Sequence, residues 1–82
     1  MDRLTDITDT VRASVKLMVD NPEDAVVECS PFEGGASLRI TVASADLGKV
    51  IGKQGRTARS LRVLASAMGM AAQLWISLDI QD

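Results

Sequence analysis

The sequence contains no histidine and only one cysteine, and both absences exclude chemistry. Without histidine, the chain lacks the most common general base and the most common neutral metal ligand. One cysteine allows neither an internal disulfide nor a zinc site made of several thiolates. We therefore expect no metal and no cofactor. An enzyme is the least favoured function, because a nucleophile–base pair would have to be built without histidine.

Aromatic residues and long apolar runs are scarce as well. One Phe, one Trp and no Tyr disfavour the RNA-binding modules that stack bases on surface aromatics. No apolar run approaches the roughly 20 residues that cross a bilayer. The N-terminus has no basic region followed by an apolar stretch, so no targeting segment is predicted. We expect a cytoplasmic protein with no membrane partner.

The length of 82 residues predicts one domain over residues 1–82. Its net charge of −2 hides a strongly uneven distribution. Residues 1–33 contain eight acidic and three basic side chains. Residues 47–78 contain no acid and five bases, which are Lys49, Lys53, Arg56, Arg59 and Arg62. Any site for an anion should therefore lie in this second, basic segment.

Hydrophobic spacing predicts an α+β fold in the order helix, strand, strand, helix, helix, strand. An amphipathic helix over residues 3–19 ends before Pro22. Strands are predicted over residues 26–32, 37–43 and 73–80, with a hairpin at Gly34-Gly35. Pro31 assigns the first strand to a sheet edge. The second and third strands are joined through helices and should run parallel, giving a three-stranded mixed sheet with helices on one face.

Two helices are predicted between the second and third strands. The shorter covers residues 45–51 with Ser44 as its N-cap, and the longer covers residues 56–68 with Gly69 as its end. The buried face of the longer helix should comprise Ala58, Leu61, Leu64, Ala65 and Met68. Three arginines, spaced three residues apart, should project along a neighbouring stripe: Arg56, Arg59 and Arg62.

The segment between these helices contains the candidate site. Gly52 and Gly55 bracket Lys53 and Gln54 in a G-x-x-G loop. Glycines let an extended ligand backbone approach closely, and the N-terminus of the following helix favours phosphate. The basic residues Lys49, Lys53, Arg56 and Arg59 can contact phosphates, while Val50 and Ile51 can line an apolar groove for bases. Such a loop can clamp a single strand of about four nucleotides.

A G-x-x-G sequence alone is more often a simple turn between helices. Here the preceding Val50-Ile51 pair and the acid-free basic block favour nucleic-acid binding. The run Val50-Ile51-Gly52-Lys53-Gln54-Gly55 resembles the signature of KH domains. The longer stretch from Leu47 to Arg62, together with Val15 to Glu23, is similar to the KhpA family of small bacterial KH proteins. This resemblance covers nearly the whole chain.

The resemblance implies a type II KH domain that binds single-stranded RNA through Gly52, Lys53, Gln54 and Gly55. It also implies an RNA chaperone or post-transcriptional regulator, linked in some bacteria to cell shape and envelope synthesis. Partners would be RNA and either a second copy, as a homodimer, or a KhpB-type KH protein, as a heterodimer. A second hypothesis remains open, in which the KH fold serves mainly for such assembly and binds RNA weakly.

Other residues have plainer interpretations. Trp75 should lie on the open sheet face, packed on the neighbouring strand or in a protein contact. Cys29 is interpreted as a small buried hydrophobic residue. The acids of the first helix should form a solvated face that also repels RNA from that side.

Overall fold

The computed structural model describes residues 2–82 and has the predicted order of elements. Its helices are α1 (Arg3–Met18), α2 (Leu47–Ile51) and α3 (Arg56–Ala71), and its strands are β1 (Val26–Phe32), β2 (Gly35–Thr41) and β3 (Trp75–Ile80). Short 3-10 turns precede β1, α2 and α3, namely η1 (Pro22–Asp24), η2 (Ser44–Asp46) and η3 (Lys53–Gly55). The predicted α+β class is confirmed.

The three strands form a mixed sheet in the order β1-β2-β3. β1 pairs antiparallel with β2, and β2 pairs parallel with β3, both as predicted. The hairpin turns at Glu33-Gly34, where Gly34 has a φ of +90°. Pro31 lies on β1, an edge strand, where its missing N–H leaves no pairing partner unsatisfied.

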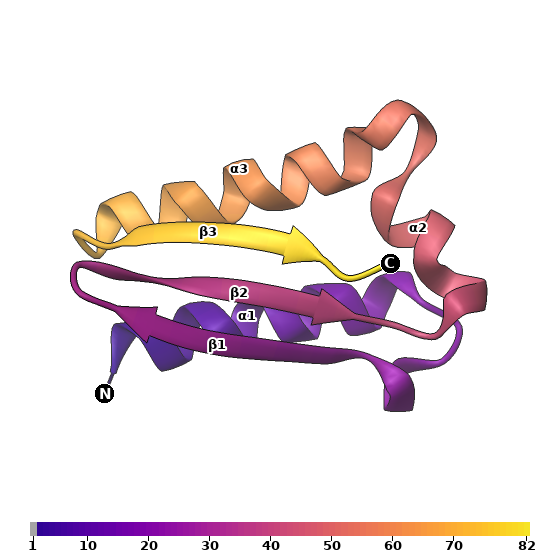
Figure 1. The fold of residues 1–82 in the computed structure, drawn as a ribbon, viewed down its shortest axis with the longest axis horizontal. Coiled ribbons are helices and arrows are strands. Elements are labelled where there is room, and N and C mark those ends of the chain that lie inside the picture. Colours follow the sequence, from indigo (N-terminus) through magenta and orange to yellow (C-terminus); the bar gives the residue numbers. More distant parts are fainter. Residues whose placement is uncertain (1) are drawn as a thin grey trace.

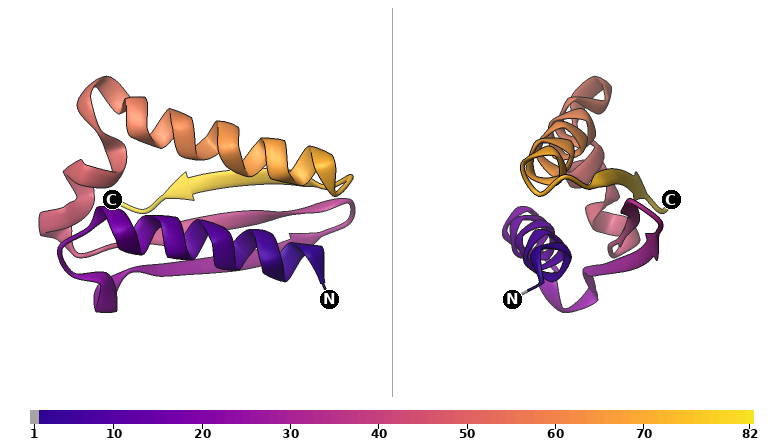
Figure 2. Two further views of the ribbon diagram at one scale, coloured as in Figure 1. Left: turned by 180° about the vertical axis from the view of Figure 1, so that it is seen from behind. Right: turned by 90° about the vertical axis from the view of Figure 1, so that its left-hand side faces the viewer.

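The helices α1 and α3 lie side by side over one face of the sheet (Figure 1), and the opposite face is uncovered (Figure 2). Alternate strand residues point into the layer between sheet and helices. The core combines them with one face of each helix, and its largest fully buried apolar side chains are Leu38, Ile40, Val11, Val15 and Val50. Cys29 is partly buried against this core. Trp75, 78% exposed, lies on the open face as predicted.

Two predictions for the long helix are wrong. Gly69 does not end α3 but lies buried within it. A Cβ at this position would come within 2.6 Å of the Ile76 side chain, so glycine is needed where the helix faces β3. Its lack of a side chain therefore allows α3 to pack closely against β3. Leu64 is exposed, since the buried stripe of α3 is narrow and follows Ala58, Leu61, Ala65 and Gly69.

Smaller differences concern the ends of elements. Ser44 does not cap a helix with its side chain, because the chain first makes the turn η2 and α2 begins only at Leu47. The first helix ends one residue early, at Met18. The second strand is shifted to Gly35–Thr41, and the third begins at Trp75 rather than residue 73, because Gln73 adopts a left-handed φ of +61° in the preceding turn.

Candidate functional site

The loop between α2 and α3 has an unusual backbone that depends on its glycines. Gly52 and Gly55 have φ values of +76° and +72°, and Gln54 between them has a φ of +58°. A Cβ on Gly52 would lie 2.2 Å from Thr57 Oγ1, so packing against α3 excludes any side chain there. A Cβ on Gly55 would meet nothing within 4 Å. The loop is therefore fixed from the side of Gly52 and open beside Gly55.

The N-terminus of α3 opens directly from this loop. Its N-cap residue is Gly55, and no side chain caps the helix. The first amides of a helix have no carbonyl partners inside it and concentrate a partial positive charge. At α3 this end lies beside the exposed side chains of Lys53 and Arg56. The amides of Gly55 and Arg56 already donate to the carbonyl oxygens of Gly52 and Lys53, so the exposed side chains of Lys53 and Arg56 are the donors that this end offers to an anionic backbone.

The five basic residues of the segment divide into two groups. Arg62 Nε donates to the carbonyl oxygen of Leu78 at 3.2 Å, so the guanidinium group supports β3 and does not join the predicted stripe. Lys49 Nζ lies 3.2 Å from Asp20 Oδ2. Lys53, Arg56 and Arg59 make no ion pair within residues 2–82. Arg56 instead donates to Gln54 Oε1 at 3.0 Å, across the tip of the loop.

The two apolar residues before the loop differ in accessibility. Val50 is fully buried, so the prediction that it lines a groove for bases is wrong. Its position on the inner side of α2 places it in the core, where it anchors the helix. Ile51 is partly exposed and remains available to a ligand. Gly48 lies on the exposed side of α2, and a Cβ there would meet nothing within 4 Å, so the fold does not require glycine at this position.

Asp46 is a residue of this region that sequence reasoning missed. Its carboxylate, 1% exposed, accepts hydrogen bonds from the backbone amides of Asp20 and Asn21 and from Asn21 Nδ2, at 3.0–3.2 Å. Burial raises the pKa of Asp46, but these hydrogen bonds and the charge of Lys49 lower it by more, so the net shift is downward. No local pattern signals this role, because the partners lie 25 and 26 residues away.

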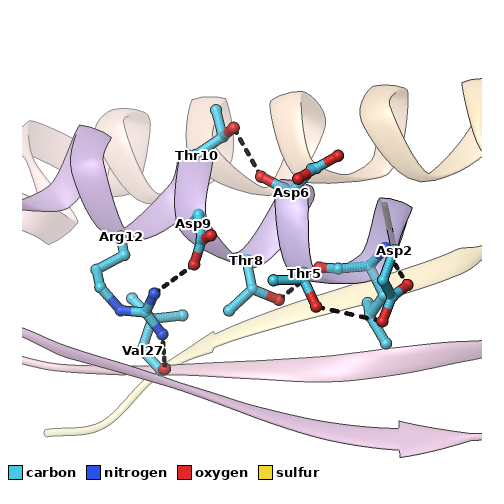
Figure 3. A network of polar contacts seen from close by, with 9 residues as sticks. Asp2, Thr5, Asp6, Thr8, Asp9, Thr10, Arg12 and Val27 are labelled. Carbon is cyan, nitrogen blue, oxygen red and sulfur yellow. Dashed lines mark hydrogen bonds and ion pairs between the residues drawn. The ribbon is translucent and has the colours of Figure 1, made fainter.

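The end of the molecule opposite the loop carries acidic side chains from the first turns of α1. The first turns of α1 lie opposite the α2–α3 loop along the long axis (Figure 1). Figure 3 shows that several of these groups are held by neighbours: Asp2 accepts from Thr5, and Asp9 pairs with Arg12 at 2.7 Å. Arg12 also donates to the carbonyl oxygen of Val27. Acids also lie at the end that carries the loop, where Asp20 pairs with Lys49 and Asp46 precedes α2, so acidic side chains are present at both ends of the molecule.

Residues 2–82 contain no cluster of side chains suited to hold a metal ion. Within the same residues, no helix has the length and apolar character that a membrane span needs.

The chain is similar to several known proteins. The family model described as KhpA/KhpB, KH domain, matches residues 8–80. RNA-binding protein KhpA of Treponema pallidum (strain Nichols) is 49% identical over 67 residues, which cover 82% of this chain and 84% of the relative. The protein of the same name from Mycobacterium bovis is 41% identical over 76 residues, covering 93% and 91%. That of Listeria monocytogenes is 39% identical over 66 residues, covering 80% and 87%.

Among solved structures, the fold resembles part of a variant of Aquifex aeolicus Era bound to GDP.AlF4-, with a TM-score of 0.64 and 15% identity. The match covers 98% of this chain and 31% of that chain, and at such low identity it shows the fold alone. The family match and the curated relatives, which are similar along most of their length, show that the chain belongs to the KhpA/KhpB family of KH domains.

Proposed function

We propose that this protein binds single-stranded RNA through the loop of residues 52–55. The observation that carries the proposal is an open glycine loop leading into a helix end that no side chain caps. Three cations without an ion pair among residues 2–82 surround it: Lys53, Arg56 and Arg59. A KH loop of this kind clamps about four nucleotides. The relatives named RNA-binding protein KhpA support RNA as the ligand.

Each type of side chain in and around the loop would make a different contact with RNA. Gly52 and Gly55 allow the sugar–phosphate backbone to approach the main chain, and Lys53 and Gln54 donate to it from the tip. Arg56 and Arg59 contact phosphates further along the strand. Lys49 adds a fourth cation, which a phosphate would draw away from Asp20. Ile51 supplies apolar contact to a base. This division accounts for binding without base stacking on aromatics.

The family is a family of binding proteins and not of enzymes. We propose that the chain acts in the cytoplasm as an RNA chaperone or post-transcriptional regulator. Binding at one small site of this type is modest in affinity, and it protects or remodels RNA by occupying single strands. A contribution to cell shape would follow from the RNAs whose folding or translation it changes.

A double variant tests the clamp. Lys53→Asp with Gln54→Asp places two negative charges at the loop tip, and both side chains are exposed, so the fold should be retained. Anisotropy titration with a labelled single-stranded RNA should show a loss of affinity of roughly tenfold or more. The matched control, Arg3→Asp with Gln73→Asp, makes the same change in net charge at the opposite end and should bind nearly as the parent does. Equal binding by the loop variant and the parent would refute the clamp.

A second candidate function, assembly, rests on the outer face of α3. Val63 and Leu64 are 63% and 44% exposed there, beside Arg59, Ser60 and Ala67 around a shallow hollow. Exposed apolar side chains at helical spacing are typical of a contact with another chain. We propose that this face pairs with a second copy or with a KhpB-type KH protein. The two functions are compatible, although Arg59 borders both surfaces.

Sedimentation velocity tests the assembly hypothesis. If α3 forms the contact, Leu64→Glu should shift the purified chain to a monomer, because a charge would be buried in the interface. Trp75→Ala, on the opposite face of the sheet, should leave the sedimentation coefficient unchanged. A parent chain that sediments as a monomer at all concentrations would exclude the homodimer. Pairing lost with Trp75→Ala instead would move the contact to the sheet.

A further inference from the structure

Asp46 stands immediately before α2 and joins two parts of the chain that are distant in sequence. Its carboxylate oxygens accept from the amides of Asp20 and Asn21, in the connection between α1 and β1, and from the Asn21 side chain. It is the only charged residue among residues 2–82 that is classed as buried. A buried carboxylate is costly unless its hydrogen bonds are satisfied, and here three donors satisfy it.

The helix α2, which follows Asp46, is too short to be stable without contacts to the rest of the fold. α2 has five residues, far fewer than a helix needs to be stable alone in water. It packs through Val50 on its inner side, and Lys49 on its outer side reaches Asp20 in the same connection. Two polar ties, one buried and one exposed, thus fix α2 to the end of α1. The loop of residues 52–55 follows α2 directly, so the position of α2 determines the position of the loop.

From this juxtaposition we infer that Asp46 is a positioning residue for the RNA clamp, acting through α2 without touching RNA. The inference rests on the proposed function. A loop that is already held in its binding geometry loses less freedom when the strand docks, so affinity depends on how firmly α2 is fixed. Removing the Asp46 carboxylate frees the amides of residues 20 and 21 and lets α2 and the loop move together.

The test compares Asp46→Ala and Asp46→Asn with a control destabilised elsewhere. The control is Ile7→Val, or Ile7→Ala if that better matches the loss in melting temperature. It weakens the core beside the N-terminal half of α1, far from the loop. All variants are measured at a temperature where each is fully folded. Two readouts are taken: affinity for single-stranded RNA, and hydrogen-exchange rates of the amides of residues 52–56 without RNA.

We expect the Asp46 variants to bind RNA about tenfold more weakly and to exchange faster over residues 52–56. The control should show neither change. An Asp46 variant that is folded, exchanges as the parent does and binds equally well would overturn the inference. If the parent protein does not bind RNA, the proposed function is refuted. Faster exchange over residues 52–56 in the Asp46 variants would still support the positioning role of Asp46. If both Asp46 variants fail to fold, Asn21→Ala is measured instead, because it removes only one of the three donors. It should weaken RNA binding and speed exchange over residues 52–56 in the same directions but by smaller amounts.

Discussion

At the scale of single residues, the glycines of this chain answer different demands. Gly52 and Gly69 are required by neighbours that a Cβ would strike, whereas Gly55 is required by its left-handed backbone. Gly48 meets neither demand, since it lies in α2 with open space beside it. A glycine inside a helix costs about 0.5–1 kcal/mol relative to alanine. At Gly48 no contact in the fold offsets that cost, so the position suits a test of whether RNA passes beside α2.

Gly48→Ala should therefore separate stability from binding. The variant should unfold at the same or a slightly higher temperature, because alanine favours the helix and its Cβ meets nothing. Its affinity for single-stranded RNA should fall, because the added methyl group narrows the approach along α2. Thermal denaturation and anisotropy titration measure the two effects. Unchanged RNA affinity would show that the strand does not run beside α2.

Arg59 and Arg62, one helical turn apart on α3, make a matched pair for a second prediction. Arg59→Ala removes a free cation and should weaken RNA binding roughly fivefold, the equivalent of about 1 kcal/mol. Arg62→Ala breaks the bond to the Leu78 carbonyl and should lower the free energy of unfolding by about 1–2 kcal/mol while RNA affinity is nearly kept. Urea denaturation and RNA titration of both variants check this. The reverse assignment of effects would contradict the division of the basic residues proposed above.

At the scale of elements, the sequence pattern predicts the three α-helices and the three strands but not the 3-10 turns. Contacts across the fold explain the errors. Apolar and polar residues alternate in β1, β2 and β3 because each strand has one buried and one open face, so the strands can be predicted from the sequence. The error at Gly69 arose because a glycine near a helix end is usually a stop, whereas here it faces Ile76 on a strand that follows the helix. Leu64 fits a helical stripe in sequence, but no layer covers the outer side of α3. Val50 and Ile51 are neighbours in sequence, and only the packing of α2 shows which of them is buried.

The tie between α2 and the α1–β1 connection predicts a pH dependence of stability. The pKa of Asp46 is lower in the folded protein than its ordinary value of 3.8. The folded state therefore binds the proton less readily than the unfolded state, so the carboxylate's contribution to stability is complete above that value and is lost as pH falls below it. Asp46→Asn should be less stable than the parent at pH 7, and the difference should shrink near pH 3. Chemical denaturation at both pH values measures it, and a difference that does not change with pH would contradict this account.

At the scale of the whole molecule, a small acidic protein concentrates its basic side chains in one segment, residues 47–62. The loop of residues 52–55 and the N-terminus of α3 lie at one end of the long axis, and the acidic first turns of α1 lie at the other (Figure 2). The basic segment could be predicted from the sequence, because residues 47–78 contain no acid. Which cations remain free could not, since Arg62 and Lys49 are engaged by partners from other elements.

The salt dependence of binding follows from the number of phosphate contacts in the proposed clamp. Four contacts, from Lys49, Lys53, Arg56 and Arg59, predict a slope of about −2 to −3 in log affinity against log salt, at about −0.7 for each phosphate contact. Titrations at several potassium chloride concentrations measure the slope, and Arg59→Ala should reduce its magnitude by about 0.7. A slope near zero would mean that apolar contacts, and not phosphates, govern binding.

The most direct test of the clamp is a map of the amides that respond to RNA. In nuclear magnetic resonance titrations with a short single-stranded RNA, the largest shift changes should fall on residues 48–59, with little change in Ser30, Ser37 and Ser77 on the open sheet face. Shift changes that gather on that sheet face, and leave the amides of residues 52–55 undisturbed, would contradict the account.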